Sequence, residues 1–212
     1  DYLTNARYGK GLPTSFINDT QFSAAATKCD AMVTPYSGGS QQKIFECNTI
    51  LETDRPVLEN AKILLSGFRG LMPYANGKYG VIVEDQGSSS FSFTESHIIG
   101  GLAIQGGTKK NRFNRVIASF VNPNANWQSD QIEYPPTGSA EEAEYLAADG
   151  VELEQRITLE TVTNVYMAQD IAEIALKRSR NGLACKFTAT SEALNCSVGD
   201  IVDVSHSTPA WT

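Results

Sequence analysis

Hydrophobic residues recur at helical spacing in three segments of this 212-residue chain. In residues 54–68 the apolar positions fall three and four apart, and Pro56 lies in the first turn, where its missing N–H costs little. Asn164 is a suitable cap for the longest stretch, 164–180, which has a narrow stripe of small residues suited to lying close on a sheet. Residues 20–32 form the third. The pattern therefore predicts three amphipathic helices.

Two shorter stretches are also predicted to be helical. Residues 2–8 precede Gly9, a residue that commonly ends a helix. Ser139 and Glu142 have the spacing of a capping box, which predicts a short helix running to residue 148.

Several segments have the patterns of β-strands. Asn76-Gly77 lies between residues 72–75 and 78–83, and this pair favours the positive φ angles of a hairpin turn. Residues 115–121 are apolar on both faces, which predicts a strand buried on both sides. Further strands are expected at 43–51, 98–105, 127–134, 151–161, 184–189 and 201–205.

The order of these elements indicates an α+β fold, because helices and strands are mixed without regular βαβ alternation. A polar stretch at 86–90 indicates a boundary near residue 95. We therefore expect two subdomains. Residues 1–95 would form an α+β unit with the Asn-Gly hairpin, and residues 96–212 a β-rich unit, barrel-like or sandwich-like, with helix 164–180 packed on it.

The charge of the chain argues against some functions. The formal net charge is −7, from 17 basic and 24 acidic residues. Specific nucleic-acid binding is not expected, because gripping a phosphate backbone depends on Lys and Arg. A lumen through which DNA slides would tolerate this charge.

No apolar run approaches the roughly 20 residues of a membrane helix. Because the chain begins with Asp1, we expect a fragment of a longer protein.

Cofactor and metal motifs are absent from the sequence. The four cysteines form no CxxC pair, so we expect free, buried thiols and no zinc site. We find no phosphate-binding loop, dinucleotide fingerprint, HExxH or EF-hand loop, and predict no cofactor.

Candidate catalytic groups are few. His97 is isolated, and the neighbours His206 and Ser207 do not supply the geometry of a nucleophile–base pair. The carboxylate pairs Glu84-Asp85 and Glu141-Glu142 are the candidates for glycoside cleavage, although adjacent acids are more often a solvated face. We predict no enzyme, with a cell-wall glycoside hydrolase as the least favoured alternative.

One basic cluster, Lys109, Lys110, Arg112 and Arg115, stands out in this acidic chain. It favours either contact with a nucleic acid or anionic glycan, or ion pairs within the chain or with a neighbour. We prefer the ion pairs, and expect Arg112 and Arg115 to form interdomain or intersubunit salt bridges.

Trp127 follows a turn and is a candidate interface residue. With Tyr134 and Trp211 it also raises the alternative of a carbohydrate- or receptor-binding module, in which the three rings are sugar platforms.

An ordered set of short motifs resembles the tail-tip, host-specificity protein J family of lambda-like siphophages. The motifs span nearly the whole chain and occur in the order expected for that family. They include Tyr-Gly-Lys-Gly-Leu-Pro (8–13), Phe-Glu-Cys-Asn (45–48), Phe-Thr-Glu (93–95), Lys-Lys-Asn-Arg-Phe-Asn-Arg-Val (109–116), Phe-Val-Asn-Pro (120–123), Thr-Asn-Val-Tyr-Met-Ala-Gln (163–169) and Val-Gly-Asp-Ile-Val-Asp-Val (198–204).

The resemblance implies a structural role in a phage or prophage virion. It implies a central segment of the tail-tip hub or baseplate, which supports tail assembly, host attachment and the DNA ejection channel. It also implies a homotrimeric ring that contacts other tail-tip and tail-tube proteins. Such a protein is made in the bacterial cytoplasm and resides at the tail tip.

Overall fold

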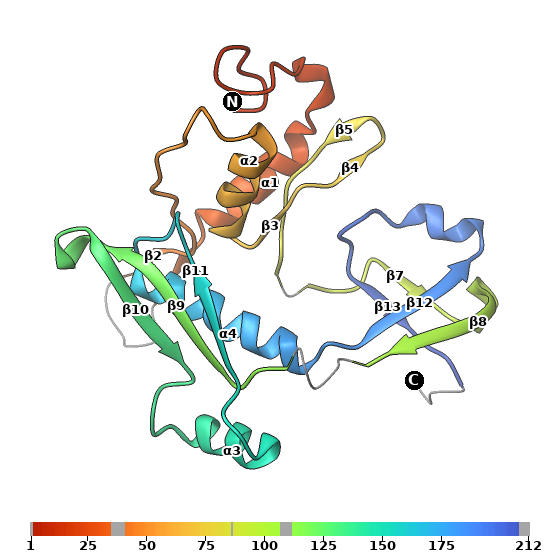
Figure 1. Cartoon of the computed structure of the whole chain (residues 1–212). Helices are drawn as coiled ribbons and strands as arrows, with labels where there is room; N and C mark the ends of the chain where they lie inside the picture. Colours follow the sequence, from red (N-terminus) through yellow and green to blue (C-terminus); the bar gives the residue numbers. More distant parts are fainter. Residues whose placement is uncertain (1, 35–40, 86, 107–111, 208–212) are drawn as a thin grey trace.

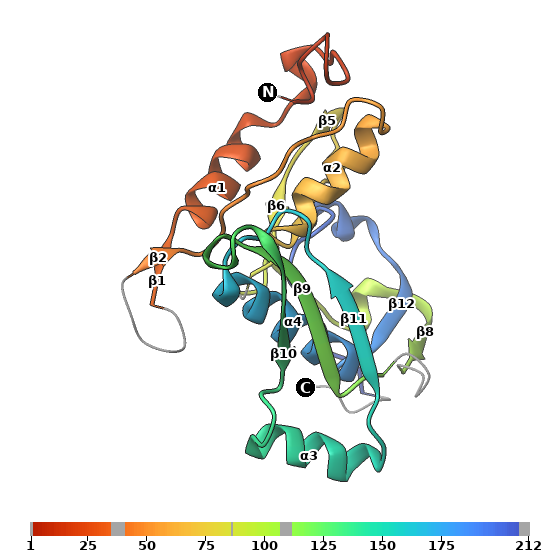
Figure 2. The same ribbon diagram turned by 60° about the vertical axis from the view of Figure 1, so that its left-hand side comes forward.

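A three-stranded mixed sheet with helix α4 (Val165–Arg180) on one face forms the centre of the molecule (Figure 1). Strand β9 (Arg115–Asn122) is the middle strand. It pairs antiparallel with β10 (Gln128–Tyr134) and parallel with β11 (Glu154–Thr158). The chain crosses from β10 to β11 through α3 (Ala140–Asp149), which lies at the foot of the sheet (Figure 2).

The sequence of β9 explains its central place. Val116, Ala118 and Phe120 alternate along the strand and are fully or almost fully buried in the core that α4 shares. Ile117 points to the other face and is also buried, but Ser119 and Val121 on that face are half-buried, so the predicted burial on both sides holds only in part. From α4, Ala168 and Ala172 are fully buried, which fits a helix that lies close on the sheet.

This computed structural model describes residues 2–34, 41–85, 87–106 and 112–207. Helices and strands are both present, and the α+β fold class is confirmed. The remaining regular elements are α1 (Asp19–Cys29), α2 (Val57–Ser66), the 3₁₀ turns η1 (Thr14–Phe16), η2 (Glu95–His97), η4 (Pro123–Ala125) and η5 (Ser191–Asn195), and the strands β1 (Met32–Val33), β2 (Gln42–Lys43), β3 (Gly70–Leu71), β4 (Tyr74–Ala75), β5 (Lys78–Tyr79), β6 (Ile82–Val83), β7 (Phe91–Phe93), β8 (Ile98–Gln105), β12 (Ala184–Ala189) and β13 (Val202–Val204).

The body of the molecule combines the central sheet and α4 with the N-terminal elements. Helices α1 and α2 lie together above the sheet, beside the short hairpin β4–β5 (Figures 1 and 2). Ala25 of α1, Phe45 and Val83 of β6 belong to the same hydrophobic core as the residues of β9 and α4. The two sides of residue 95 therefore contribute to one core, and the predicted division into 1–95 and 96–212 stays a prediction.

A second group of strands, called the lobe here, comprises residues 91–105 and 184–205. In it β7 pairs with β13 in parallel, and β8 pairs with β12 antiparallel. Phe91, Phe93 and Phe187 pack together between these two ribbons. The lobe lies beside the body, on the right in Figure 1.

The chain crosses between body and lobe close to the C-terminal end of α4. Glu84, before the first crossing, pairs with Arg178 at 2.9 Å between carboxylate and guanidinium. The carbonyl of Phe113, after the second crossing, accepts a hydrogen bond from the Ser179 hydroxyl at 3.3 Å. The third crossing leaves α4 itself, which ends at Arg180 and leads to β12. One end of one helix is thus next to all three crossings.

Several predicted elements are confirmed and two are wrong. Helix 164–180, strand 98–105 and the Asn76-Gly77 hairpin occur where expected. Residues 2–8 form turns instead of a helix, because the Asn5 side chain accepts hydrogen bonds from the backbone N–H groups of Arg7 and Tyr8.

The predicted strand 43–51 is almost entirely irregular, with only Lys43 paired in a short β2. Its backbone N–H groups find separate partners. Phe45 donates to the Cys29 carbonyl, and Asn48 donates to the Thr161 carbonyl. Beyond Lys43, no strand of the described residues pairs with the segment.

The expectation of a barrel-like C-terminal part is not met, because none of the sheets that the structure describes closes into a barrel. The apolar strands that indicated a barrel instead build the helix-covered sheet and the two ribbons of the lobe.

Candidate functional site

A charged cluster joins α3, α4 and the start of β9. The Asp149 carboxylate, at the C-terminal end of α3, is 6% exposed. It pairs with Arg180 at 2.6 Å and with Arg112 at 3.1 Å, and accepts a hydrogen bond from Asn114 at 3.1 Å. An acid is unfavourable at this end of a helix, because the helix dipole is negative there. The two guanidinium groups offset that cost.

The environment of Asp149 also sets its ionisation. Burial alone raises the pKa of this carboxyl group, but the hydrogen bonds from Arg180 and Asn114 and the charges of both arginines outweigh burial. The net result is a pKa below the ordinary value of an aspartate. The carboxylate is therefore held in its charged form.

Aromatic side chains extend the cluster along α3. The Arg180 guanidinium lies 4.2 Å from the centre of the Tyr145 ring, a cation–π contact. The hydroxyls of Tyr145 and Tyr134 each donate to Glu141 at 2.8 Å. Burial, together with the bond to Glu141, raises the pKa of Tyr145 to about 12.

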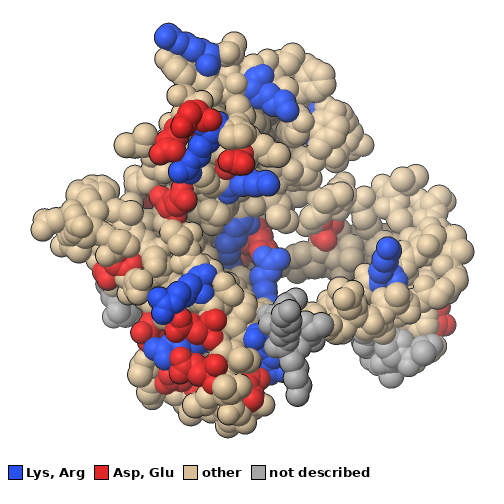
Figure 3. Space-filling model, in the orientation of Figure 1, with Lys and Arg blue, Asp and Glu red and all other residues tan. Residues whose placement is uncertain are grey.

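Arg115 forms a separate set of contacts at the edge of the cluster. Its guanidinium pairs with Glu133 of β10 at 2.5 Å and with Glu152, just before β11, at 3.2 Å. Charged side chains of both signs are interspersed over this part of the body in Figure 3. Arg115 therefore bridges the two strands that flank β9.

Arg112 and Arg115 form ion pairs inside the chain, but all their partners lie in the predicted unit 96–212, so these pairs are not the interdomain or intersubunit salt bridges that were expected. Contact of either arginine with another subunit stays a prediction. Lys109 and Lys110 lie outside the described residues.

Asp149, Arg180 and Asn114 were not singled out from the sequence. Their convergence depends on the packing of α3 against the end of α4, which local spacing does not reveal.

Trp127 projects at the tip of the hairpin between β9 and β10. Its side chain is 64% exposed, and its backbone has φ of +60°. The preceding Asn126 is also left-handed, with φ of +56°. Asparagine tolerates this conformation, whereas it strains a bulky residue. A strained, exposed tryptophan at the tip of a hairpin is a candidate contact residue.

Replacing Trp127 with glycine is expected to stabilise the isolated chain by about 1 kcal/mol, because glycine adopts a positive φ without steric cost. Asn126→Gly is the matched control and should change stability by a few tenths of a kcal/mol at most. Urea unfolding followed by circular dichroism measures both. A destabilised Trp127→Gly variant would mean that the indole packs on the chain itself.

The proposed sugar platform of Trp127, Tyr134 and Trp211 is only partly supported. Tyr134 is a buried core residue, so its ring is not available to a sugar. Trp211 lies outside the described residues.

The carboxylate pairs considered for glycoside cleavage are each held by neighbours. Glu84 pairs with Arg178, and Asp85 pairs with Lys28 at 3.5 Å. Glu141 accepts the two tyrosine hydroxyls, and Glu142 accepts a hydrogen bond from the Gly138 N–H. These contacts give the acids structural partners.

The two histidines and the cysteines build no assembled site in the described part of the chain. His97 pairs with Glu192 at 2.7 Å, whereas His206 and the Ser207 N–H both contact Glu95. No group of three or more potential metal ligands occurs among the described residues.

The cysteines are free, but Cys47 and Cys185 are exposed, so the prediction of burial is wrong for these two. No described helix has the length and apolar character needed to cross a membrane.

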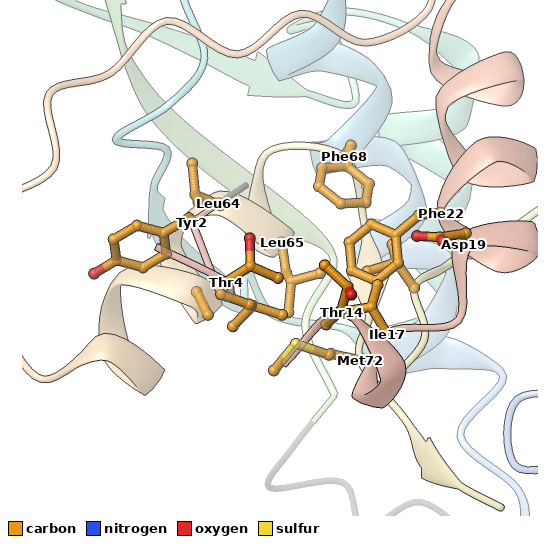
Figure 4. A pocket seen from close by; sticks show the side chains of 13 residues that line it. Tyr2, Thr4, Thr14, Ile17, Asp19, Phe22, Leu64, Leu65, Phe68 and Met72 are labelled. Atoms are coloured by element: carbon orange, nitrogen blue, oxygen red, sulfur yellow. The ribbon is translucent and has the colours of Figure 1, made fainter. Parts of the chain in front are cut away.

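A cavity of about 420 Å³ lies between α1, α2 and the N-terminal segment (Figure 4). Its walls are mainly apolar, with Phe22, Leu65, Phe68 and Met72 among them. Of the polar lining residues, Asp19 is the one with a carboxylate, so the cavity holds no converging set of acids and bases.

Two comparisons with known proteins bear on this fold. Residues 65–212 match the model of a family described as "Putative phage tail protein". The baseplate hub protein pb3 of Escherichia phage T5 is 24% identical over 226 residues, and the alignment covers 100% of this chain. This chain corresponds to 23% of the length of that relative.

Proposed function

Because this chain belongs to that family of phage tail proteins, we propose that it is a structural segment of the central hub at the tail tip. The observation that carries the proposal is the alignment of the whole chain with part of a baseplate hub protein. A scaffold needs no assembled catalytic groups. In the described residues the candidate acids and histidines serve instead as partners in ion pairs and hydrogen bonds.

The proposal includes the finer features implied by the resemblance to the protein J family. Under this proposal, the chain contributes to a homotrimeric ring around the DNA ejection channel and contacts other tail-tip or tail-tube proteins. A formal charge of −7 suits a conduit that does not retain DNA. Residues 1–95 and 96–212 would be its two subdomains, and Trp127, Arg112 and Arg115 its candidate contacts with neighbours.

Electron microscopy with an antibody raised against this chain tests the proposed location. The expected result is decoration of virions at the tail tip. An antibody against the major capsid protein is the matched control and should decorate heads. Virions that contain the parent protein but bind the antibody along the tube, or nowhere even after mild disruption of the tip, would contradict the proposal.

The alternative function is a carbohydrate- or receptor-binding module, which the exposed Trp127 favours. It predicts that the chain binds glycans of the host surface and that Trp127→Gly abolishes this binding. The hub proposal predicts no glycan binding by either form. A glycan array probed with both proteins separates the two functions.

A further inference from the structure

The cavity between α1 and α2 has the size and the walls of a small-molecule site (Figure 4). Its volume of about 420 Å³ falls within the range of about 300–1,000 Å³ that ligand sites in proteins occupy. Most of its lining is apolar, contributed by the N-terminal segment, α1, α2 and the chain after α2. Water is a poor occupant of such a space, because an ordered water needs about two to four polar partners. The cavity is therefore suited to a molecule with an apolar body.

The apolar side chains that line the cavity leave part of their surface uncovered. Phe22, Leu65, Phe68 and Met72 are half-buried, although all four pack against the hydrophobic core. An occupant that covered them would gain the free energy of removing apolar surface from water. Burial of this surface is thus the main source of affinity that the cavity offers.

Hydrogen bonds fix the N-terminal segment that forms one wall of the cavity. Asn60 of α2 is 1% exposed, and its amide donates to the Tyr2 hydroxyl at 2.9 Å and to the Glu52 carbonyl at 2.8 Å. At the other end of the segment, the Asn18 N–H donates to the Tyr79 carbonyl at 2.9 Å. Because the segment is held at both ends, it does not readily collapse into the space. The cavity is thus formed by the fold itself, as ligand sites usually are.

One charged side chain is present in this apolar lining. Asp19 is the first residue of α1 and lies three positions before Phe22, so the two share a face of the helix. Figure 4 shows the Asp19 side chain extending from α1 towards the Phe22 ring. Asp19 is exposed, which places it at the open end of the cavity. No Lys, Arg or His is among the described residues of the lining, so this position favours a cation.

We propose that this cavity binds a small amphiphile, with its apolar body between α1 and α2 and a cationic end beside the Asp19 carboxylate. A cation at the open end keeps its contact with water, so the ion pair forms without the cost of burying a charge. An anionic end would be repelled by the carboxylate. This inference goes beyond the proposed function, because a location at the tail tip neither requires nor excludes a ligand.

Octylamine, octanol and octanoate share one apolar chain and differ in charge, so they test both parts of the site. In calorimetric titrations at neutral pH, the wild-type chain should bind octylamine roughly two- to fivefold more tightly than octanol, as expected for an exposed ion pair. Octanoate should bind more weakly than octanol. Asp19→Asn should remove the preference for the amine and keep the affinity for octanol. Glu59→Gln removes an exposed charge on α2 outside the cavity and should bind all three probes as wild type does.

Leu65→Trp tests the location, because the larger side chain would occupy part of the cavity. This variant should bind octanol at least about tenfold more weakly than wild type. Leu58→Trp is the matched control, since Leu58 is also on α2 but is 58% exposed and lies outside the lining. It should bind octanol as wild type does. Circular dichroism checks that both variants are folded.

The methionine methyl signals in NMR spectra locate the ligand in the wild-type chain without any substitution. Met72 lines the cavity, whereas Met32 and Met167 do not. On addition of octylamine the Met72 signal should shift and the other two should stay in place. A wild-type chain that binds none of the three probes would overturn the inference, as would equal affinity for octylamine and octanoate or an unchanged Met72 signal. A folded Leu65→Trp variant with wild-type affinity for octanol would overturn it too.

Discussion

Asp149→Ala is expected to destabilise the chain by about 3 kcal/mol, because it leaves two guanidinium groups close together without their shared carboxylate. Arg180 is 12% exposed and has little access to water as a substitute partner. Asn114 would also lose one of its acceptors. Urea unfolding followed by circular dichroism measures the loss.

Glu152→Ala is the matched control for Asp149→Ala. Glu152 also pairs with an arginine, at 3.2 Å from Arg115, but its side chain is half exposed. Exposed ion pairs contribute little, so this variant should lose no more than about 1 kcal/mol. If both variants lost the same free energy of unfolding, burial of Asp149 would add nothing to the strength of its ion pairs.

The lowered pKa of Asp149 predicts that the stability of the chain depends on pH. The pKa of Asp149 is lower in the folded chain than in the unfolded chain, so its ionised form stabilises the fold. That contribution is fully present above about pH 4, the unfolded value, and is lost as the pH falls through the folded value. The free energy of unfolding of Asp149→Ala should therefore approach that of wild type in acid. If the difference in free energy of unfolding between the two proteins stayed constant as the pH fell, ionisation of Asp149 would be excluded as its origin.

Ala172→Leu is expected to destabilise the chain by about 2 kcal/mol or more. Ala172 is fully buried in the core between α4 and the central sheet, and a larger side chain would push the helix away from β9. Ala147→Leu is the control, because Ala147 lies exposed on α3. Thermal unfolding measures both. A stable Ala172→Leu variant would mean that the helix can shift at little cost.

The sequence predicted best where one residue pattern decides the structure. The small residues of 164–180 predicted a helix lying close on a sheet, and Ala168 and Ala172 are among the five buried residues there. Asn76-Gly77 fixed its hairpin through the φ angles that these residues accept.

Prediction from the sequence failed where contacts between distant parts of the chain determine the local structure. Residues 44–51 have the composition of a strand, but they are irregular because no strand in the described part of the chain pairs with them. The parallel pairing of β7 with β13 joins residues more than 100 positions apart, and the Asp149 cluster joins three separate segments. For Arg112 and Arg115 the sequence predicted ion pairing, but not the identity of their acids.

The three crossings beside the end of α4 have a mechanical consequence. A load applied to the lobe enters the body next to Arg178–Arg180 and is carried along the helix axis into the sheet. The lobe also meets the body at Gly199, whose backbone lies close to the Ile82 side chain of β6. A rotation of the lobe about the end of α4 would therefore have to displace this contact as well.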